Sequence, residues 1–232
     1  MTVISFINPK GGTGKTTSAI LIAEQAALAE NTTLILDCDP NNNIDYWYQE
    51  REQRGDKTPF TVAKGPSALD LIDIVEEYEK ENDLVILDME GSADQIVTFA
   101  IAISDLTIIP FKPSPMEARQ CARAIHLVKQ SARLGSSNGE FRLLVNRSNA
   151  AIRTKEETIL RKELGEAGLD KKLLSSRLVD RAAYMRIFRD HKLLYELSVE
   201  EDANIGKATA NAQDVFLEIL KVLKEIAHVT RI

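Results

Sequence analysis

Asn8-Pro9-Lys10-Gly11-Gly12-Thr13-Gly14-Lys15-Thr16-Thr17 is the stretch of sequence that decides the fold. An apolar run at residues 3–7 precedes it and is typical of a buried strand, and residues 18–29 follow with the composition of a helix. A strand, a glycine-rich turn and a helix form the context that a phosphate-binding loop needs. Glycines let backbone N–H groups close around phosphate oxygens, and the helix N-terminus adds partial positive charge.

The loop supplies the side chains that nucleotide phosphates require. Lys15 can reach the β- and γ-phosphates, and the Thr16 hydroxyl can ligate Mg²⁺. The general pattern G-x-x-x-x-G-K-[ST] begins with glycine, whereas this chain has Pro9 at that position and two glycines after Lys10. The predicted nucleotide-binding residues of the loop are Lys10, Gly11, Gly12, Thr13, Gly14, Lys15, Thr16 and Thr17.

Apolar runs alternate with segments of helical spacing along the rest of the chain. Further strands are predicted at residues 32–37, 60–63, 83–88, 106–110, 141–145 and 173–179. Helices are predicted at about 68–80, 96–103, 117–134, 153–167 and 208–229, and residues 41–59 are predicted to be a loop and an exposed helix. Near-continuous apolar strands that alternate with helices indicate a mostly parallel sheet covered on both faces. We therefore expect a single α/β domain over residues 1–232.

Polar residues follow the predicted strands where each one ends. Asp39, Asp88, Pro113 and the pair Asn146-Arg147 come after four different strands. In open α/β sheets ligands bind at the carboxyl ends of the strands, where the phosphate loop also lies. Asp88 closes an apolar strand and is a candidate Mg²⁺ ligand, although an acid that starts a turn is also common.

Composition excludes several classes of protein. No apolar run approaches the ~18 residues of a membrane span, and no signal peptide is visible. Cys38 and Cys121 match no metal or redox spacing, so we expect two reduced, buried thiols. Residues 1–116 carry 8 Lys and Arg against 19 Asp and Glu, and residues 117–232 carry 21 against 16, which gives the halves net charges of −11 and +5. The basic half permits a surface that binds a polyanion.

The sequence K-G-G-x-G-K-T-T at residues 10–17 resembles the deviant Walker A loop of the ParA/MinD family of partition and positioning ATPases. The resemblance covers nearly the whole chain and is closest to the short, ParF-like partition proteins, which lack the N-terminal helix-turn-helix extension of longer relatives. It implies a P-loop ATPase fold, ATP and Mg²⁺ as substrate and cofactor, and a face-to-face homodimer with two nucleotides in its interface.

The resemblance also implies roles for single residues. Lys10 would reach across the dimer to the partner's phosphates, and Asp39 would orient the attacking water, so that Lys10, Lys15 and Asp39 are the expected catalytic residues. Thr16, Asp39 and Asp88 would surround the metal. Asn146 and Arg147 would meet the adenine, with Pro113 as a wall of the same pocket. The chain departs from the family in having Asn41 after the D-x-D-P segment and Glu90-Gly91 after the strand that ends at Asp88.

The expected partners follow from the same resemblance. Dimers of such proteins in the ATP state bind DNA without sequence preference, and an adaptor protein bound at the centromere stimulates their slow hydrolysis, which segregates plasmid or chromosome DNA. The chain is expected in the cytoplasm, associated with the nucleoid in its ATP state. The candidate DNA-binding residues are Arg177, Arg181, Arg186, Arg189 and Lys192.

Other interpretations stay open at this point. Each basic residue of 177–192 can belong to an ordinary solvated helix face. The last helix can pack in the core or, in a MinD-like positioning ATPase, bind a membrane surface; its glutamates favour the core. A metabolic P-loop enzyme related to dethiobiotin synthetase would need no DNA-binding face. A nitrogenase-type ATPase is disfavoured because two cysteines cannot hold a cluster at the dimer axis.

Overall fold

A computed structural model describes residues 1–91, 94–133, 139–149 and 154–230. Within these residues seven parallel strands form one sheet, with the order β3-β2-β4-β1-β5-β6-β7. The strands are β1 (Thr2–Phe6), β2 (Thr33–Cys38), β3 (Thr61–Lys64), β4 (Leu84–Met89), β5 (Leu106–Phe111), β6 (Phe141–Ser148) and β7 (Leu178–Val179). The predicted fold class is confirmed.

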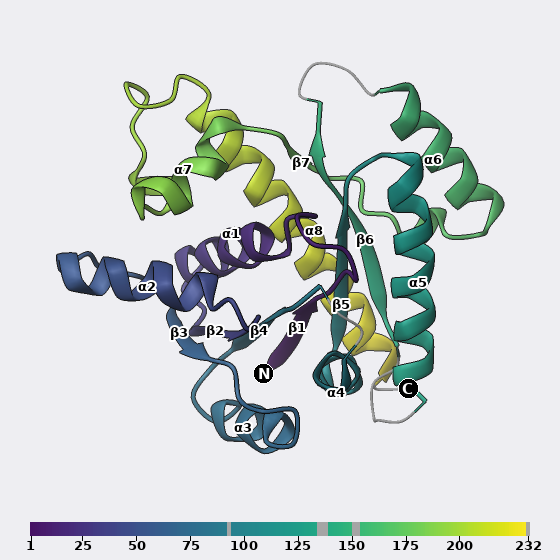
Figure 1. The fold of residues 1–232 in the computed structure, drawn as a ribbon, viewed down its shortest axis with the longest axis horizontal. Coiled ribbons are helices and arrows are strands. Elements are labelled where there is room, and N and C mark those ends of the chain that lie inside the picture. The colour runs from purple at the N-terminus through teal and green to yellow at the C-terminus, as the bar shows by residue number, and fades with distance from the viewer. Residues whose placement is uncertain (92–93, 134–138, 150–153, 231–232) are drawn as a thin grey trace.

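Helices cover both faces of the sheet (Figure 1). The helices α1 (Lys15–Leu28), α2 (Asn43–Arg54), α7 (Ala182–Asp190) and α8 (Ile205–Thr230) bury their apolar residues on one face, together with the short 3₁₀ helix η2 (Leu194–Glu196). The helices α3 (Leu71–Tyr78), α4 (Gln95–Ile103), α5 (Pro115–Ser131) and α6 (Lys155–Glu166) cover the other face. A second 3₁₀ helix, η1 (Asp170–Lys172), follows α6.

Alternation along β1 shows why both faces are apolar. Val3 and Ile7 lie in the core beneath α3 to α6, whereas Ile4 and Phe6 lie in the core beneath α1 and α8. Successive side chains of a strand point to opposite faces, so a central strand covered by helices must be apolar at nearly every position. All four of these side chains are at most 2% exposed.

The segment α2 differs from its prediction as an exposed helix. Ile44, Trp47 and Arg51 are buried, and the Trp47 indole N–H donates to the Ile187 carbonyl of α7 at 2.8 Å. The Arg51 guanidinium donates to both carboxylate oxygens of Glu196, at 2.7 and 2.8 Å, and lies 5.2 Å from the Trp47 ring centroid. Polar and charged residues together dominate the composition of α2, so only the tertiary contacts reveal its buried side.

Two further segments refine the predicted elements. The last strand is shorter than residues 173–179, because only Leu178–Val179 forms a strand and Leu173 makes an isolated bridge to Leu143. The predicted basic stretch that follows contains the helix α7. In α8 the apolar residues Val215, Phe216, Ile219 and Val222 are buried in the core, which confirms the core-packing interpretation of the last helix. No helix of the described residues is both long and apolar enough to cross a membrane.

Candidate nucleotide-binding site

The loop between β1 and α1 is fastened at its beginning by Asn8. The Asn8 side-chain N–H₂ donates to the Pro110 carbonyl of β5 at 2.8 Å, and its Oδ1 accepts from the Lys10 backbone N–H at 2.9 Å. Asn8 is 1% exposed, so its bond to Pro110 is shielded from water, and its bond with Lys10 is partly shielded. Sequence reasoning quoted Asn8 within the motif without a role; the structure makes it the brace between the loop and the end of β5.

The end of the loop is fastened by Asn146 of β6. Its Nδ2 donates to the carbonyls of Thr13 at 3.1 Å and Gly14 at 3.3 Å. Gly14 has φ of 96°, and a Cβ built on it would lie 1.9 Å from Asn146 Nδ2. Both the left-handed backbone and the close approach of β6 therefore require glycine at this position.

Helix α1 begins directly beyond this glycine. No side chain caps its N-terminus, and its first turn contains no acid. The first backbone N–H groups of a helix have no partner inside the helix and carry partial positive charge. An uncapped helix start behind a glycine loop is therefore suited to an anion such as a phosphate.

Lys15 lies at the bottom of the loop. Its ammonium group is within 3.4 Å of the Asn8 carbonyl and 3.5 Å of the Lys10 carbonyl, and the residue is 6% exposed. Burial lowers the pKa of Lys15, while the nearby carboxylates of Asp88, Asp39 and Glu90 oppose that shift. Both hydrogen bonds given for the Lys15 ammonium are to neutral carbonyl oxygens. A direct contact with an anionic ligand would therefore stabilise this buried cation strongly.

Three carboxylates at the ends of β2 and β4 have different roles. Asp37 accepts from the backbone N–H groups of Ile44 at 2.9 Å and Asp45 at 3.0 Å, so it holds the start of α2. Asp39 accepts from the Asn41 backbone N–H at 2.9 Å and lies at the edge of the cavity. Asp88 is 1% exposed, and neither of its carboxylate oxygens has a hydrogen-bond partner among the described residues.

Asp88 is the residue that best fits a metal ion. Burial raises its pKa to about 7, against the opposing effects of the Thr16 hydroxyl and Lys15. The described residues contain no group of three or more His, Cys, Asp or Glu that could hold a metal by themselves. Mg²⁺ commonly uses one or two protein carboxylates and completes its shell with water and substrate phosphates. The buried, unpaired oxygens of Asp88 beside Thr16 fit that arrangement.

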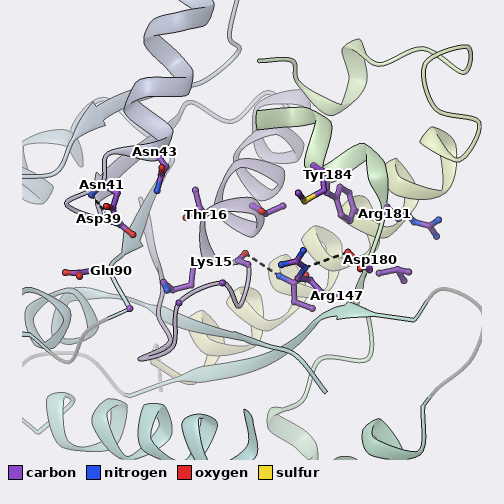
Figure 2. Close-up of a pocket in the computed structure, with 18 residues that line it drawn as sticks. Lys15, Thr16, Asp39, Asn41, Asn43, Glu90, Arg147, Asp180, Arg181 and Tyr184 are labelled. Carbon is purple, nitrogen blue, oxygen red and sulfur yellow. Dashed lines mark hydrogen bonds and ion pairs between the residues drawn. The ribbon is translucent and has the colours of Figure 1, made fainter. Parts of the chain in front are cut away.

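These elements surround a cavity of about 480 Å³ (Figure 2). Its floor is the phosphate loop and the start of α1, and the figure shows Asp39, Asn41 and Glu90 on one side with Arg147, Asp180 and Tyr184 on the other. Nine predicted nucleotide-site residues line it: Gly11, Gly12, Gly14, Lys15, Thr16, Thr17, Asp39, Asn146 and Arg147. The predicted residues Lys10, Thr13, Asp88 and Pro113 are not among those that line it.

Residues 4–223 match a family model described as the CobQ/CobB/MinD/ParA nucleotide binding domain. The chain belongs to this family. Protein ParA of Rhizobium radiobacter is 27% identical over 225 residues, which cover 97% of this chain and 99% of that protein. The family match, residues 4–223, therefore includes every residue that lines the cavity and at least part of every strand of the sheet.

Two solved structures show the same fold as this CobQ/CobB/MinD/ParA domain. An ATP complex of a variant of McdA from Cyanothece has a TM-score of 0.76 at 15% identity and covers 94% of this chain and 96% of its own. The MinD cell division protein of Aquifex aeolicus has a TM-score of 0.67 at 16% identity, with coverages of 95% and 98%. At these identities the likeness shows the fold.

One wall of this cavity was not predicted from the sequence. Val179, Asp180, Tyr184 and Met185 line the cavity from β7 and α7. The Tyr184 hydroxyl donates to the Ala208 carbonyl at 2.9 Å, which fixes this wall to α8. The signal was weak because β7 has only two residues, although Asp180 follows it at the cavity as Asp39 follows β2 and Glu90 follows β4.

Arg147 connects this wall to β6. It has φ of 52°, and its backbone N–H donates to Asn146 Oδ1 at 2.8 Å, which supports the left-handed conformation. Its guanidinium lies 3.7 Å from the Asp180 carboxylate (Figure 2). The amide of Asn146 is occupied by the phosphate loop, so the more exposed Arg147 is the better placed of the two to meet a base.

The predicted DNA-binding residues occupy different surroundings. Arg181 lines the nucleotide cavity and donates to Asn211 at 3.0 Å. The other four are engaged by carboxylates: Arg177 by Glu157 at 3.1 Å, Arg186 by Asp190 at 2.8 Å, Arg189 by Asp190 at 2.6 Å and Lys192 by Glu201 at 2.6 Å. Sequence spacing alone could not show the pairs of Arg177 and Lys192, because their partners Glu157 and Glu201 lie outside the stretch.

Proposed function

We propose that this chain is a ParA-type partition ATPase that forms a face-to-face dimer around two ATP molecules, binds DNA without sequence preference in that state, and hydrolyses ATP slowly until an adaptor at the centromere stimulates it. Family membership implies ATPase activity. The observation that carries the proposal is the braced phosphate loop, with buried Lys15 below it and the unpaired Asp88 carboxylate beside it. The similarity to a protein named ParA over the whole chain supports the partition role.

The cavity residues suit phosphoryl transfer to water. The loop N–H groups and Lys15 would bind the phosphates and neutralise their charge, which is the largest need of this reaction. Thr16 and Asp88 would hold Mg²⁺, which would supply positive charge that stabilises the reacting phosphates. Asp39 lies at the edge of the cavity, where it can accept a hydrogen bond from an attacking water.

Lys10 is proposed to act on the nucleotide of the partner subunit. It is not among the residues that line its own cavity, while its backbone N–H is fixed by Asn8 and its carbonyl lies beside Lys15. A cation supplied in trans would stabilise the charge that develops as the β–γ bond breaks. Loss of the γ-phosphate would then weaken the dimer, which makes the assembly a switch timed by hydrolysis.

Three variants test this function. Lys15→Ala should weaken ATP binding at least about 100-fold, because a buried charge-assisted contact is lost.

Lys10→Ala should bind ATP but lose dimerisation or turnover, and Asp39→Ala should form a lasting ATP dimer. Fluorescent-ATP titration, sedimentation and phosphate release measure these properties. Lys64→Ala, which is outside the nucleotide cavity, is the matched control. Tight ATP binding by Lys15→Ala, or normal turnover by Asp39→Ala, would contradict the assignment.

The DNA contact itself was assigned from sequence to Arg177, Arg181, Arg186, Arg189 and Lys192, and this assignment stays a prediction. Nucleoid association would follow from such binding. Four of these residues are paired with carboxylates, which reduces the positive charge that this face of the molecule can offer to DNA.

A further inference from the structure

Most of helix α5 and the turn after it lie in a long segment of the chain that contains no acidic residue. Residues 118–139 contain three arginines, one lysine and no aspartate or glutamate. Arg123 and Lys129 lie on α5, and Arg133 lies in the turn that follows it; all three side chains are exposed. At 100° per residue, these positions fall within an arc of about 120° on one side of the helix. We call these three residues the α5 basic stripe.

The charges of the α5 basic stripe have no neutralising partner in the part of the chain that the structure describes. None of its three residues forms an ion pair or a side-chain hydrogen bond with another described residue. In the stretch 177–192, by contrast, Arg189 and Lys192 lie 2.6 Å from the carboxylates of Asp190 and Glu201. A phosphate that approaches a paired cation must compete with its carboxylate and is repelled by it, whereas an unpaired cation needs to release only its counterions.

The position of the stripe leaves the nucleotide site accessible. The apolar residues of α5 pack on the face of the sheet opposite to α1, α7 and α8, and Figure 1 shows α5 on the far side of the sheet from α7. The cavity opens at the carboxyl ends of the strands, and no residue of α5 lines it among those described. A polymer on α5 would therefore not displace ATP or cover the edge of the sheet where a second copy would dock.

We propose that the α5 basic stripe is the surface that contacts the phosphate backbone of DNA. This inference rests on the proposed function, since it names the face that serves it. The stripe extends roughly 15 Å along the helix axis at 1.5 Å per residue, and duplex DNA of that length carries about nine phosphate charges. Cations along the exposed side of a helix can contact backbone phosphates, which carry no sequence information, so the stripe would bind DNA without sequence preference. Two stripes in an ATP dimer would strengthen binding by presenting both to one polymer.

The test compares two double variants of the full chain that remove the same charges from opposite faces. Arg123→Gln with Lys129→Gln weakens the α5 basic stripe. Arg189→Gln on α7 with Lys192→Gln just after it is the matched control, called the α7 control. Each is titrated with a labelled 40-base-pair duplex of random sequence, with a non-hydrolysable ATP analogue and with ADP, from about 50 to 200 mM salt. Fluorescent-ATP binding and thermal unfolding confirm that both variants are folded and bind nucleotide.

The α5 double variant should bind DNA at least tenfold more weakly than the wild type. The slope of log affinity against log salt should fall by about 3 to 4, since two phosphate contacts in each of two subunits are lost at about 0.9 each. The α7 control should stay within about threefold of the wild type. Wild-type DNA binding by the α5 variant, or a larger loss in the α7 control, would overturn the assignment to α5 while leaving the proposed function intact.

Failure of the proposed function gives a different pattern. A wild-type protein that dimerises with ATP but binds no DNA in either nucleotide state would contradict DNA binding altogether, and the stripe assignment with it. In that case vesicles with and without anionic lipid identify the alternative. Vesicle binding lost only in the α5 variant would assign the stripe to a membrane surface and overturn our proposal.

Discussion

Gly14 shows how closely a single residue can be constrained by its neighbours. Gly14→Ala should abolish nucleotide binding and lower the free energy of unfolding by about 3 kcal/mol, because its Cβ would meet Asn146 at 1.9 Å and its φ of 96° disfavours any side chain. Gly168→Ala is a matched control, since Gly168 also has positive φ (68°) but has open space around it, and it should cost only about 1 kcal/mol. Urea unfolding measures both, and equal losses would show that backbone strain, not the contact with Asn146, sets the requirement.

For single residues, the sequence predicted the side chains that face the cavity better than the residues that hold the phosphate loop in place. The glycines, Lys15, Thr16 and Asp39 were predicted from their spacing after strands, and the structure brings them to one cavity. Asn8 and Asn146 act as braces through bonds to Pro110 and Thr13, which lie 102 and 133 residues away along the chain. A contact between residues so distant leaves no local pattern.

A buried ion pair fastens α2 to the segment after α7. Arg51 is fully buried and donates to Glu196, to the carbonyls of Lys57 and His191, and to the Thr58 hydroxyl. Arg51→Ala should lower the free energy of unfolding by about 3 kcal/mol, since it leaves a partly buried carboxylate and two carbonyls without their donor. Arg54→Ala removes a half-exposed guanidinium 3.9 Å from Glu50 and should cost less than about 1 kcal/mol. A similar loss in both variants, measured by chemical unfolding, would argue against a structural role for the Arg51 pair.

Glu24 of α1 supports the same segment and titrates near neutrality. It accepts from the backbone N–H groups of Leu194 and Tyr195 at 2.9 Å, and burial raises its pKa from 4.5 to about 7. The folded protein therefore holds this proton where the unfolded chain has lost it, so the contribution of Glu24 to stability is greatest at low pH and is lost as the pH rises through about 7.

Glu24→Gln should remove this part of the pH dependence. Between pH 5.5 and 8 the free energy of unfolding of the wild type should fall by about 2 kcal/mol more than that of the variant. Urea unfolding at both pH values measures the difference, and Asp88, which titrates in the same direction, cancels because both proteins contain it. Glu30→Gln, at an exposed position, should keep the wild-type dependence. A variant with an unchanged pH dependence would show that Glu24 is already ionised at pH 5.5.

Elements were predictable where their apolar pattern is strong. The central strands and α3 to α6 follow from apolar runs and helical spacing, because their burial is set by the sheet itself. The helix α7 and the buried side of α2 were missed, because Trp47 and Arg51 are buried by contacts with one another and with Ile187 and Glu196 rather than by the sheet. The polar and charged composition of α2 predicted an exposed helix. The contacts of Trp47 and Arg51 instead bury one side of that helix.

For the whole molecule, ligand binding and stability should be linked. ATP with Mg²⁺ at 100 times its dissociation constant should stabilise the folded state by about 2.7 kcal/mol, which for a chain of 232 residues raises Tm by roughly 5–10 °C. EDTA should remove most of that shift if Thr16 and Asp88 hold the metal. Thermal unfolding of the wild type and of Asp88→Asn measures this dependence. A full shift in the presence of EDTA would show that nucleotide binding does not need the metal.

The braces at the two ends of the phosphate loop set the order in which the site can be completed during synthesis. The loop leaves the ribosome well before its partners Pro110 and Asn146, because the two contacts span 102 and 133 residues of the chain. A nascent chain that ends before β6 has the glycines and Lys15 but lacks the residue that holds Thr13 and Gly14. Nucleotide can therefore stabilise the protein through a completed phosphate loop only after β6 has emerged.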